Sequence, residues 1–251
     1  MEEIVRTTLL GLFFGTFGTT IGGIIGVTFK EPSNRFLSFI LQFAAGLMSA
    51  IICFDLIPEA LEVSNLSSIF IGVFAGVIAM VFCDNCVKKL YKKKETTKKS
   101  TSSLLKTGII VGIGLAIHNF PEGLAIGSGF ESSIKLGYSL ALVIALHDIP
   151  EGISMSVPMK NGGMSKTKAV ILTLLSGLTT GIGAFFGAIV GGISENIIGI
   201  CLAFAARSNA LHSIRRTNTR IQQNLHRTNG NSWQYNRIYT RNISNANMKS
   251  E

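Results

Sequence analysis

The chain carries two copies of one six-residue motif, each with a histidine, a second polar residue, a proline, a glutamate and a glycine. The first copy reads His-Asn-Phe-Pro-Glu-Gly over residues 118–123, and the second reads His-Asp-Ile-Pro-Glu-Gly over residues 147–152. Both copies lie in the middle of apolar segments that are long enough to cross a membrane. An acidic residue at the centre of such a segment costs roughly 2.5–3.5 kcal/mol on insertion scales. The acids of these motifs therefore need a partner, and a bound cation fulfils that need.

The spacing within each motif gathers its polar side chains on one side of a helix, because residues three and four positions apart share a face. Consecutive spans run antiparallel, and both motifs lie near mid-span, so the two polar faces are expected to meet at the same depth. Such a pair of faces predicts a site for one or two divalent ions. The six candidate ligands are His118, Asn119 and Glu122 in the first copy, and His147, Asp148 and Glu151 in the second.

The donor types narrow the choice of metal. A mixture of imidazole and carboxylate suits zinc, iron(II), manganese or cadmium better than magnesium or calcium, which prefer oxygen ligands alone. The residues do not choose among these four metals. A single histidine in a membrane helix is commonly only a packed, hydrogen-bonded residue, but the duplication in mid-span favours a metal site.

Membrane helices are the elements that must hold these motifs. The composition is 47% hydrophobic and only 15% charged, with 27 glycines, which is unusual for a soluble domain of 251 residues. Six apolar runs are each about long enough to cross a hydrocarbon core of roughly 30 Å. We therefore predict an all-α, polytopic membrane helix bundle in a lipid bilayer. The predicted spans cover residues 4–29, 36–57, 69–86, 104–129, 136–157 and 169–193, and a shorter run covers 197–206.

Loop charge predicts the orientation, because cytoplasmic connections carry the excess of lysine and arginine. The connections after the third and fifth spans are rich in lysine, whereas those after the second and fourth are not. We therefore expect the lysine-rich loops on the cytoplasmic side of a cell membrane and the amino terminus on its outer side. The lysines are Lys88, Lys89, Lys92, Lys93, Lys94, Lys98, Lys99 and Lys106 in one loop, and Lys160, Lys166 and Lys168 in the other.

Two further groups of polar residues in the apolar runs can be explained either by a structural role or by a functional one. Asp55, Pro58 and Glu59 form a D-x-x-P-E string at the outer end of the second span, with the same Pro-Glu pair as the two motifs. These acids either form a mouth that collects ions or are a solvated helix cap. Cys83 and Cys86 form a C-x-x-C pair, but without a second pair they are more simply explained as buried thiols.

Residues 207–251 differ in composition from the rest of the chain. This segment has eight lysines and arginines against one acid, nine asparagines and one glycine. A basic arm for RNA or anionic lipid is one interpretation. The change falls inside the apolar run 197–206, however, so we favour a truncated or frameshifted end without a nucleic-acid partner. We accordingly predict a transmembrane domain over residues 1–206 and a disordered or non-native basic tail after it.

An internal repeat links the two ends of the predicted bundle. Gly22 and Gly26 of the first span recur at an offset of 161 residues as Gly183 and Gly187 of the sixth span. At the same offset, Phe-Ala-Ala-Gly over residues 43–46 is matched by Phe-Ala-Ala at 204–206. An odd separation in span number would invert one copy relative to the other, a layout that many transporters use.

With these paired motifs on consecutive helices, the chain resembles the ZIP family of zinc and iron permeases, in its short prokaryotic-type branch, over residues 1–206. The resemblance implies a bundle of eight helices in a 3+2+3 arrangement with an inverted repeat, of which about six to seven lie in this chain. It implies that divalent transition metals move into the cytoplasm through a binuclear centre, and it is compatible with a homodimer.

The resemblance also implies how the polar residues divide between two metal positions. One position would use both histidines, and the other would use Asn119 and Asp148, with Glu122 and Glu151 bridging the two. Some relatives add a glutamate from the sixth helix, but residues 176–181 read Ser-Gly-Leu-Thr-Thr-Gly here. The expected mechanism is alternating access, in which spans one, four, five and six move against the rest.

Two other classes of function compete with a permease. An intramembrane metalloprotease also places histidine and glutamate in lipid, but it uses the string H-E-x-x-H. This chain contains H-x-x-x-E twice and no such string, so we expect no enzyme. A metal-binding fragment that does not transport is the other alternative, because the resemblance stops at Ala206.

Overall fold

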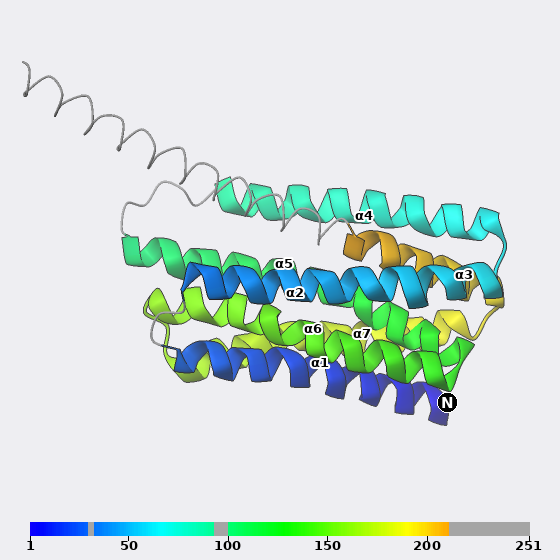
Figure 1. Cartoon of the computed structure of the whole chain (residues 1–251), viewed down its shortest axis with the longest axis horizontal. Helices are drawn as coiled ribbons and strands as arrows, with labels where there is room; N and C mark the ends of the chain where they lie inside the picture. The colour runs from blue at the N-terminus through cyan, green and yellow to red at the C-terminus, as the bar shows by residue number, and fades with distance from the viewer. Residues whose placement is uncertain (30–32, 93–99, 211–251) are drawn as a thin grey trace, which may run out of the picture. The chain divides into compact units, whose positions relative to one another are not determined.

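The computed structural model describes residues 1–29, 33–92 and 100–210, and every regular element in these ranges is a helix. The predicted all-α bundle is therefore confirmed. The elements, drawn in Figure 1, are α1 (Glu2–Thr28), α2 (Asn34–Ile51), the π-helix η1 (Ile52–Leu56), α3 (Ile57–Val63), α4 (Leu66–Lys92), α5 (Ser100–Ser132), α6 (Ile134–Asn161) and α7 (Lys166–Gly191), followed by a helical segment over residues 195–210.

Six segments of the described chain are long and apolar enough to cross a membrane, which confirms a multi-pass membrane protein. Most of the observed helices extend a few residues beyond the predicted runs, because helix ends continue into the polar residues that flank the apolar core. The segments are Glu2–Thr28, Arg35–Val63, Leu66–Val87, Leu104–Ser132, Ile134–Asn161 and Lys166–Gly191.

Four of these spans form one closely packed unit, because glycines let their backbones approach. α1 and α5 each pack against both α6 and α7. A methyl group at Gly18 of α1 would strike the backbone carbonyl of Ala145 on α6. The glycines that end the two sequence motifs serve the same purpose, since a methyl group at Gly123 would strike α7 and one at Gly152 would strike α1. Small residues at such contacts are typical of membrane helix pairs.

The same packing occurs twice, in agreement with the internal repeat of the sequence. Gly22 of α1 fits against the carbonyl of Ile149 in the second motif, where a methyl group would collide. Gly183 of α7 fits in the same way against the carbonyl of Phe120, at the corresponding position of the first motif. α1 and α7 run in opposite directions (Figure 1), so the pair α1–α6 is an inverted counterpart of the pair α7–α5.

Residues 34–63 form one helical rod, which we call the α2–α3 arm, interrupted by the π-turn Ile52–Leu56. Pro58 explains the interruption, because its nitrogen cannot donate to the carbonyl four residues earlier. The N–H of Ile57 accordingly bonds the carbonyl of Ile52, five residues back. Asp55 lies in this π-turn, and Glu59 follows in the first turn of α3.

The helical segment 195–210 packs beside α4. A methyl group at Gly72 of α4 would strike the backbone carbonyl of Ile200. At the start of the same pair, Asn65 donates a hydrogen bond of 2.8 Å to the side chain of Asn196. The shorter apolar run of the sequence is thus part of the packed structure.

This last helix continues through residue 210, beyond the domain boundary drawn from the sequence at Ala206. The described residues up to 210 all belong to one compact unit. Residues 211–251, which hold most of the predicted basic tail, lie outside the described residues, as do residues 93–99 of the lysine-rich loop.

Candidate metal site

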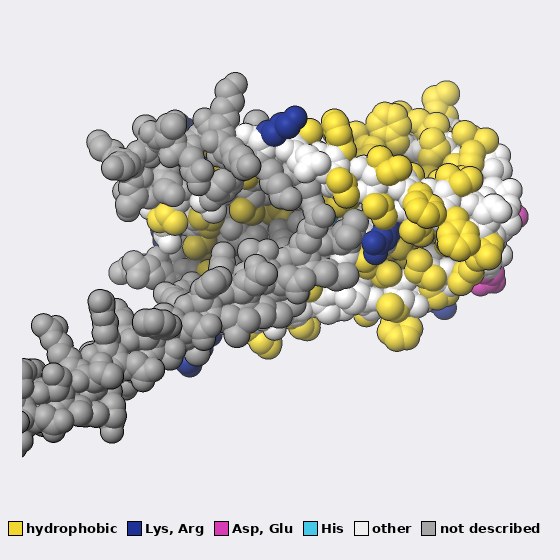
Figure 2. Space-filling model, turned by 90° about the horizontal axis from the view of Figure 1, so that it is seen from above, with side chains coloured by type: hydrophobic (Ala, Val, Ile, Leu, Met, Phe, Trp, Pro, Cys, Tyr) yellow, Lys and Arg dark blue, Asp and Glu magenta, His cyan; other side chains and the backbone are white. Residues whose placement is uncertain are grey.

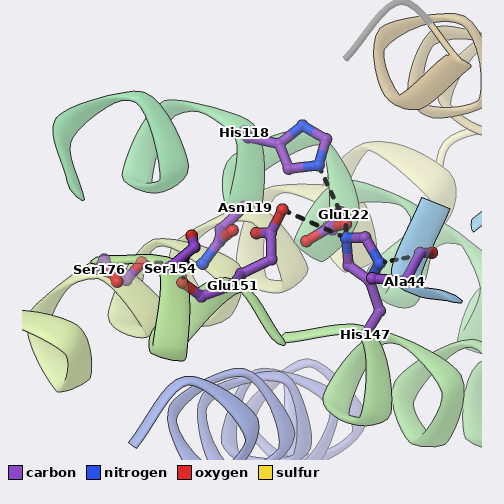
Figure 3. Close-up of polar contacts among 8 residues, drawn as sticks. All are labelled: Ala44, His118, Asn119, Glu122, His147, Glu151, Ser154 and Ser176. Carbon is purple, nitrogen blue, oxygen red and sulfur yellow. Dashed lines mark hydrogen bonds and ion pairs between the residues drawn. The ribbon is translucent and has the colours of Figure 1, made fainter. Parts of the chain in front are cut away.

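The two sequence motifs meet in the interior of the four-helix unit, and Figure 3 shows five of their six polar side chains. α5 and α6 carry one motif each, and both helices continue through the prolines of the motifs. None of the six side chains is more than 3% exposed. They are His118, Asn119 and Glu122 of α5, and His147, Asp148 and Glu151 of α6.

The carboxylate of Glu122 lies between the two histidine rings (Figure 3). Its Oε1 atom is 3.4 Å from Nε2 of His118 and 3.6 Å from Nε2 of His147. Oε1 of Glu151 lies 3.5 Å from the same nitrogen of His147. These separations exceed the distance of about 2.7–3.2 Å that is typical of an N···O hydrogen bond.

The same separations fit ligands that share a metal ion. Zinc binds imidazole nitrogen and carboxylate oxygen at about 2.0–2.2 Å, which places neighbouring ligands of a tetrahedral site about 3.3–3.6 Å apart. His118, His147 and Glu151 each offer one ligand atom, and these atoms lie within 4.8 Å of one another. The arrangement can therefore hold a transition metal ion with mixed nitrogen and oxygen ligands.

A backbone carbonyl of α2 orients the second histidine. Nδ1 of His147 lies 3.0 Å from the carbonyl oxygen of Ala44. A carbonyl oxygen only accepts hydrogen bonds, so Nδ1 carries the proton and donates it. In the neutral ring, Nε2 then keeps its lone pair and directs it toward Glu122 and Glu151. Metal-binding histidines are commonly held in this way by a partner on the other ring nitrogen.

A second set of donors in the same interior consists of oxygen atoms. Asn119 donates from Nδ2 to the backbone carbonyl of Ser176 on α7, at 3.2 Å. The other end of this amide, Oδ1, is buried and has no hydrogen-bond partner among the described residues. The same holds, within the described chain, for both carboxylate oxygens of Asp148. Buried acceptors in this condition are costly unless a cation or a donor occupies the space beside them.

Sequence patterns did not identify the two carbonyls that hold these ligands. Ala44 and Ser176 are ordinary members of apolar helices, and every residue has a carbonyl, so no residue type marks this role. Within the segment 176–181, the backbone carbonyl of Ser176 holds the side chain of Asn119.

The other candidates of the sequence do not join the metal-ligand cluster found among the described residues. Asp55 and Glu59 are half-buried, and Glu59 accepts a hydrogen bond from Ser132 at the end of α5. Cys83 and Cys86 are free thiols on α4. A mouth that collects ions at Asp55 and Glu59 therefore stays a prediction.

Comparisons with known proteins agree with these motifs. The family model described as ZIP zinc transporter matches residues 94–206. Zinc transporter ZupT of Enterobacter sp. (strain 638) is 34% identical over 112 residues, which cover 43% of this chain and 44% of that protein. Zinc transporter ZupT of Salmonella heidelberg (strain SL476) is 32% identical over 130 residues, covering 50% and 49% of the two chains. The chain thus spans about half the length of the curated relatives that it matches.

The matched segment contains both motifs and the whole of α5, α6 and α7. The named relatives are transporters and not enzymes, as the sequence predicted. Residues 94–206, which hold all six candidate ligands, thus match the ZIP family of zinc transporters.

Proposed function

We propose that the chain moves a divalent transition metal ion, zinc above all, across a cell membrane into the cytoplasm. One observation carries this proposal: two histidines and two glutamates lie buried together inside a unit of membrane helices, at separations that fit metal ligands. The relatives named as zinc transporters support zinc. Iron(II), manganese and cadmium accept the same donors.

The donor set supports two metal positions that share the glutamates. The first would use His118 and His147, and the second would use the oxygens of Asn119 and Asp148. Glu122 and Glu151 would bridge them, which agrees with the place of Glu122 between the two histidine rings. Three carboxylates (−3) and two divalent ions (+4) leave a formal charge of +1, so ions and acids largely offset each other's cost of burial.

Charge at the two ends of the unit supports an amino terminus outside the cell. Figure 2 shows, for the described residues of one face, acidic side chains at one end only, beyond a broad apolar surface. This is the end at which α1 begins (Figure 1), and most of the described lysines lie at the other, with Lys135 as an exception; the positive-inside rule assigns the lysine-rich end to the cytoplasm. The acids are Glu2, Glu3, Glu62, Glu131 and Glu195, and the lysines are Lys89, Lys106, Lys160, Lys166 and Lys168.

Alternating access is the mechanism that this architecture favours. The four-helix unit is locked by contacts between backbones, whereas the α2–α3 arm meets it through side chains. A hydrated metal ion would exchange water for imidazole and carboxylate in the interior, and would leave toward the lysine-rich end when the unit moves against the arm. The homodimer compatible with the family resemblance stays a prediction.

Radiolabelled zinc uptake into proteoliposomes tests the proposal. We expect time-dependent accumulation, and we expect it to disappear in the double variant Glu122→Ala and Glu151→Ala. The matched control is Glu62→Ala, an exposed acid on α3, which should leave uptake unchanged. Equal uptake by the double variant and the unaltered chain would contradict the proposed site.

A metal-binding chain without transport is the second candidate, because the chain covers only about half of its relatives. Equilibrium zinc binding to the purified protein separates the two. Binding that disappears with Glu122 and Glu151, without accumulation in vesicles, would favour this second candidate over a permease.

A further inference from the structure

The surface between α2 and α6 differs from the contacts inside the four-helix unit. α1, α5, α6 and α7 meet through glycines, so a small displacement of one helix would drive backbone into backbone. On α2, by contrast, Met48 and Ile51 belong to the same apolar cluster as Leu140 and Ile144 of α6. Contacts between apolar side chains have no fixed direction. This contact between α2 and α6, which we call the seam, can therefore change register at less cost than the glycine contacts inside the four-helix unit.

A directed polar contact crosses this seam at the metal site. The hydrogen bond from Nδ1 of His147 to the carbonyl of Ala44 spans 3.0 Å, and both residues are at most 3% exposed. Figure 3 shows the ring of His147 between this carbonyl on one side and the two glutamates on the other. The residue that offers a ligand atom to the metal is thus also the residue that contacts α2.

The register of the seam therefore decides the chemistry of His147. While Ala44 accepts from Nδ1, the lone pair of Nε2 is available to a metal ion. A slide of one helical turn, about 5.4 Å, would carry Nδ1 out of reach of this carbonyl. The ring would then be free to place its proton on Nε2 or to rotate, and in either case it would be a poorer ligand.

From this geometry we infer that the Ala44 carbonyl is a positioning group, which makes His147 a strong metal ligand only in the register of α2 and α6 seen here. The inference rests on the proposed function and deepens it, because it states how movement of the four-helix unit weakens the site. Loss of a partner on a metal-bound histidine typically lowers metal affinity by about 10–100-fold. By reciprocity, bound zinc favours this register by the same factor.

The chain offers a matched pair of substitutions on α2. Ala44 is buried, and a larger side chain in Ala44→Leu would push α2 away from α6 and break the hydrogen bond. Gly46 is exposed, and a Cβ atom there would meet no described atom of another element within 4 Å. Gly46→Leu therefore adds the same side chain to the same helix without disturbing the seam.

A second variant alters the histidine and leaves α2 as it is. Nδ1-methylhistidine at position 147, introduced by an expanded genetic code, keeps the Nε2 lone pair but cannot donate to Ala44. If Ala44→Leu fails to fold, this variant still tests the inference.

Two measurements on the purified protein decide the outcome. Nitrogen-15 NMR of labelled histidine reports which ring nitrogen carries the proton, and the chain has only four histidines to assign. We expect the proton of His147 on Nδ1 in the unaltered chain and in Gly46→Leu. We expect zinc affinity to fall about 10–100-fold in Ala44→Leu and in the methylhistidine variant, and to stay unchanged in Gly46→Leu.

A proton on Nε2 of His147 in the unaltered chain would overturn the inference. Unchanged zinc affinity in a folded Ala44→Leu protein and in the methylhistidine variant would overturn it as well. In both cases the unaltered chain could still take up zinc, so the proposed function would survive. If the unaltered chain instead neither binds nor takes up zinc, the proposed function fails, and the inference fails with it.

Discussion

Replacement of Glu122 by glutamine should change stability in opposite directions with and without metal. The carboxylate of Glu122 is fully buried beside two histidines, and the acids Asp148 and Glu151 are buried in the same interior. Without metal, the variant removes one buried charge. A charge buried beside other carboxylates is costly through desolvation and like-charge repulsion, so the metal-free variant should be the more stable protein.

With zinc the order should reverse. A ligand at 100 times its dissociation constant stabilises the folded state by about 2.7 kcal/mol. The unaltered chain should gain this amount, whereas a neutral amide is a weaker bridge and the variant should gain little of it. For a chain of this size, each kcal/mol moves the melting temperature by about 2–4 °C. The zinc-induced shift of the unaltered chain should therefore amount to about 5–11 °C, and that of the variant should be much smaller.

Thermal melts followed by circular dichroism in detergent, with a chelator and with excess zinc, measure both effects. The control is Glu131→Gln, an acid at the end of α5 away from the motif, which should leave the zinc-induced shift intact. An equal zinc-induced shift in Glu122→Gln and in the unaltered chain would refute the reasoning. A metal-free variant that melts below the unaltered chain would show that Glu122 is a structural residue.

Three further outcomes follow from the same geometry. Asp148→Asn should reduce zinc stoichiometry from two ions to one, since it removes the only charged donor that the second position does not share, and elemental analysis of the purified protein checks this. Zinc affinity should fall as the pH is lowered from 7 to about 5, because protons compete for imidazole and carboxylate, and equilibrium binding across that range would show no slope if these residues were not ligands. Ser208→Ala with Asn209→Leu should stabilise the protein by about 1–3 kcal/mol, because Ser208 Oγ and Asn209 Oδ1 are buried without a partner among the described residues; an unchanged unfolding midpoint in denaturant would contradict it.

The helices were predictable from the sequence because membrane helices are marked by long apolar runs. Six spans follow from hydropathy alone, and the motif spacing places three polar residues on each of two helix faces. The interruption at Ile52–Leu56 was not predicted, although Pro58 is its physical cause. Proline removes a hydrogen bond in any helix, and whether the backbone widens, kinks or ends there depends on packing that a single sequence does not display.

The candidate ligands were predictable for a different reason, since buried acids in apolar runs are rare and costly. The groups that position these ligands were not predictable from the sequence. Gly22 and Gly183 can be aligned as a repeat in the sequence, but only the structure shows that each packs against the carbonyl at the third position of a motif. The carbonyls of Ala44 and Ser176 leave no trace in residue type, because the backbone group is common to all residues.

The inverted repeat makes the one difference between the two motifs informative. By the offset of 161 residues, Gly15 of α1 corresponds to Ser176 of α7. α1 packs against α6, which carries Asp148, and α7 packs against α5, which carries Asn119. The Gly15 carbonyl accepts the hydroxyl of Thr19 at 2.8 Å, and the Ser176 carbonyl accepts both the hydroxyl of Thr179 at 2.7 Å and the amide of Asn119 at 3.2 Å. An aspartate at position 148 has no N–H to donate to a carbonyl in the way that Asn119 donates to Ser176. The exchange of amide for carboxylate therefore breaks the symmetry at the proposed second metal position, where a divalent ion would need negative charge.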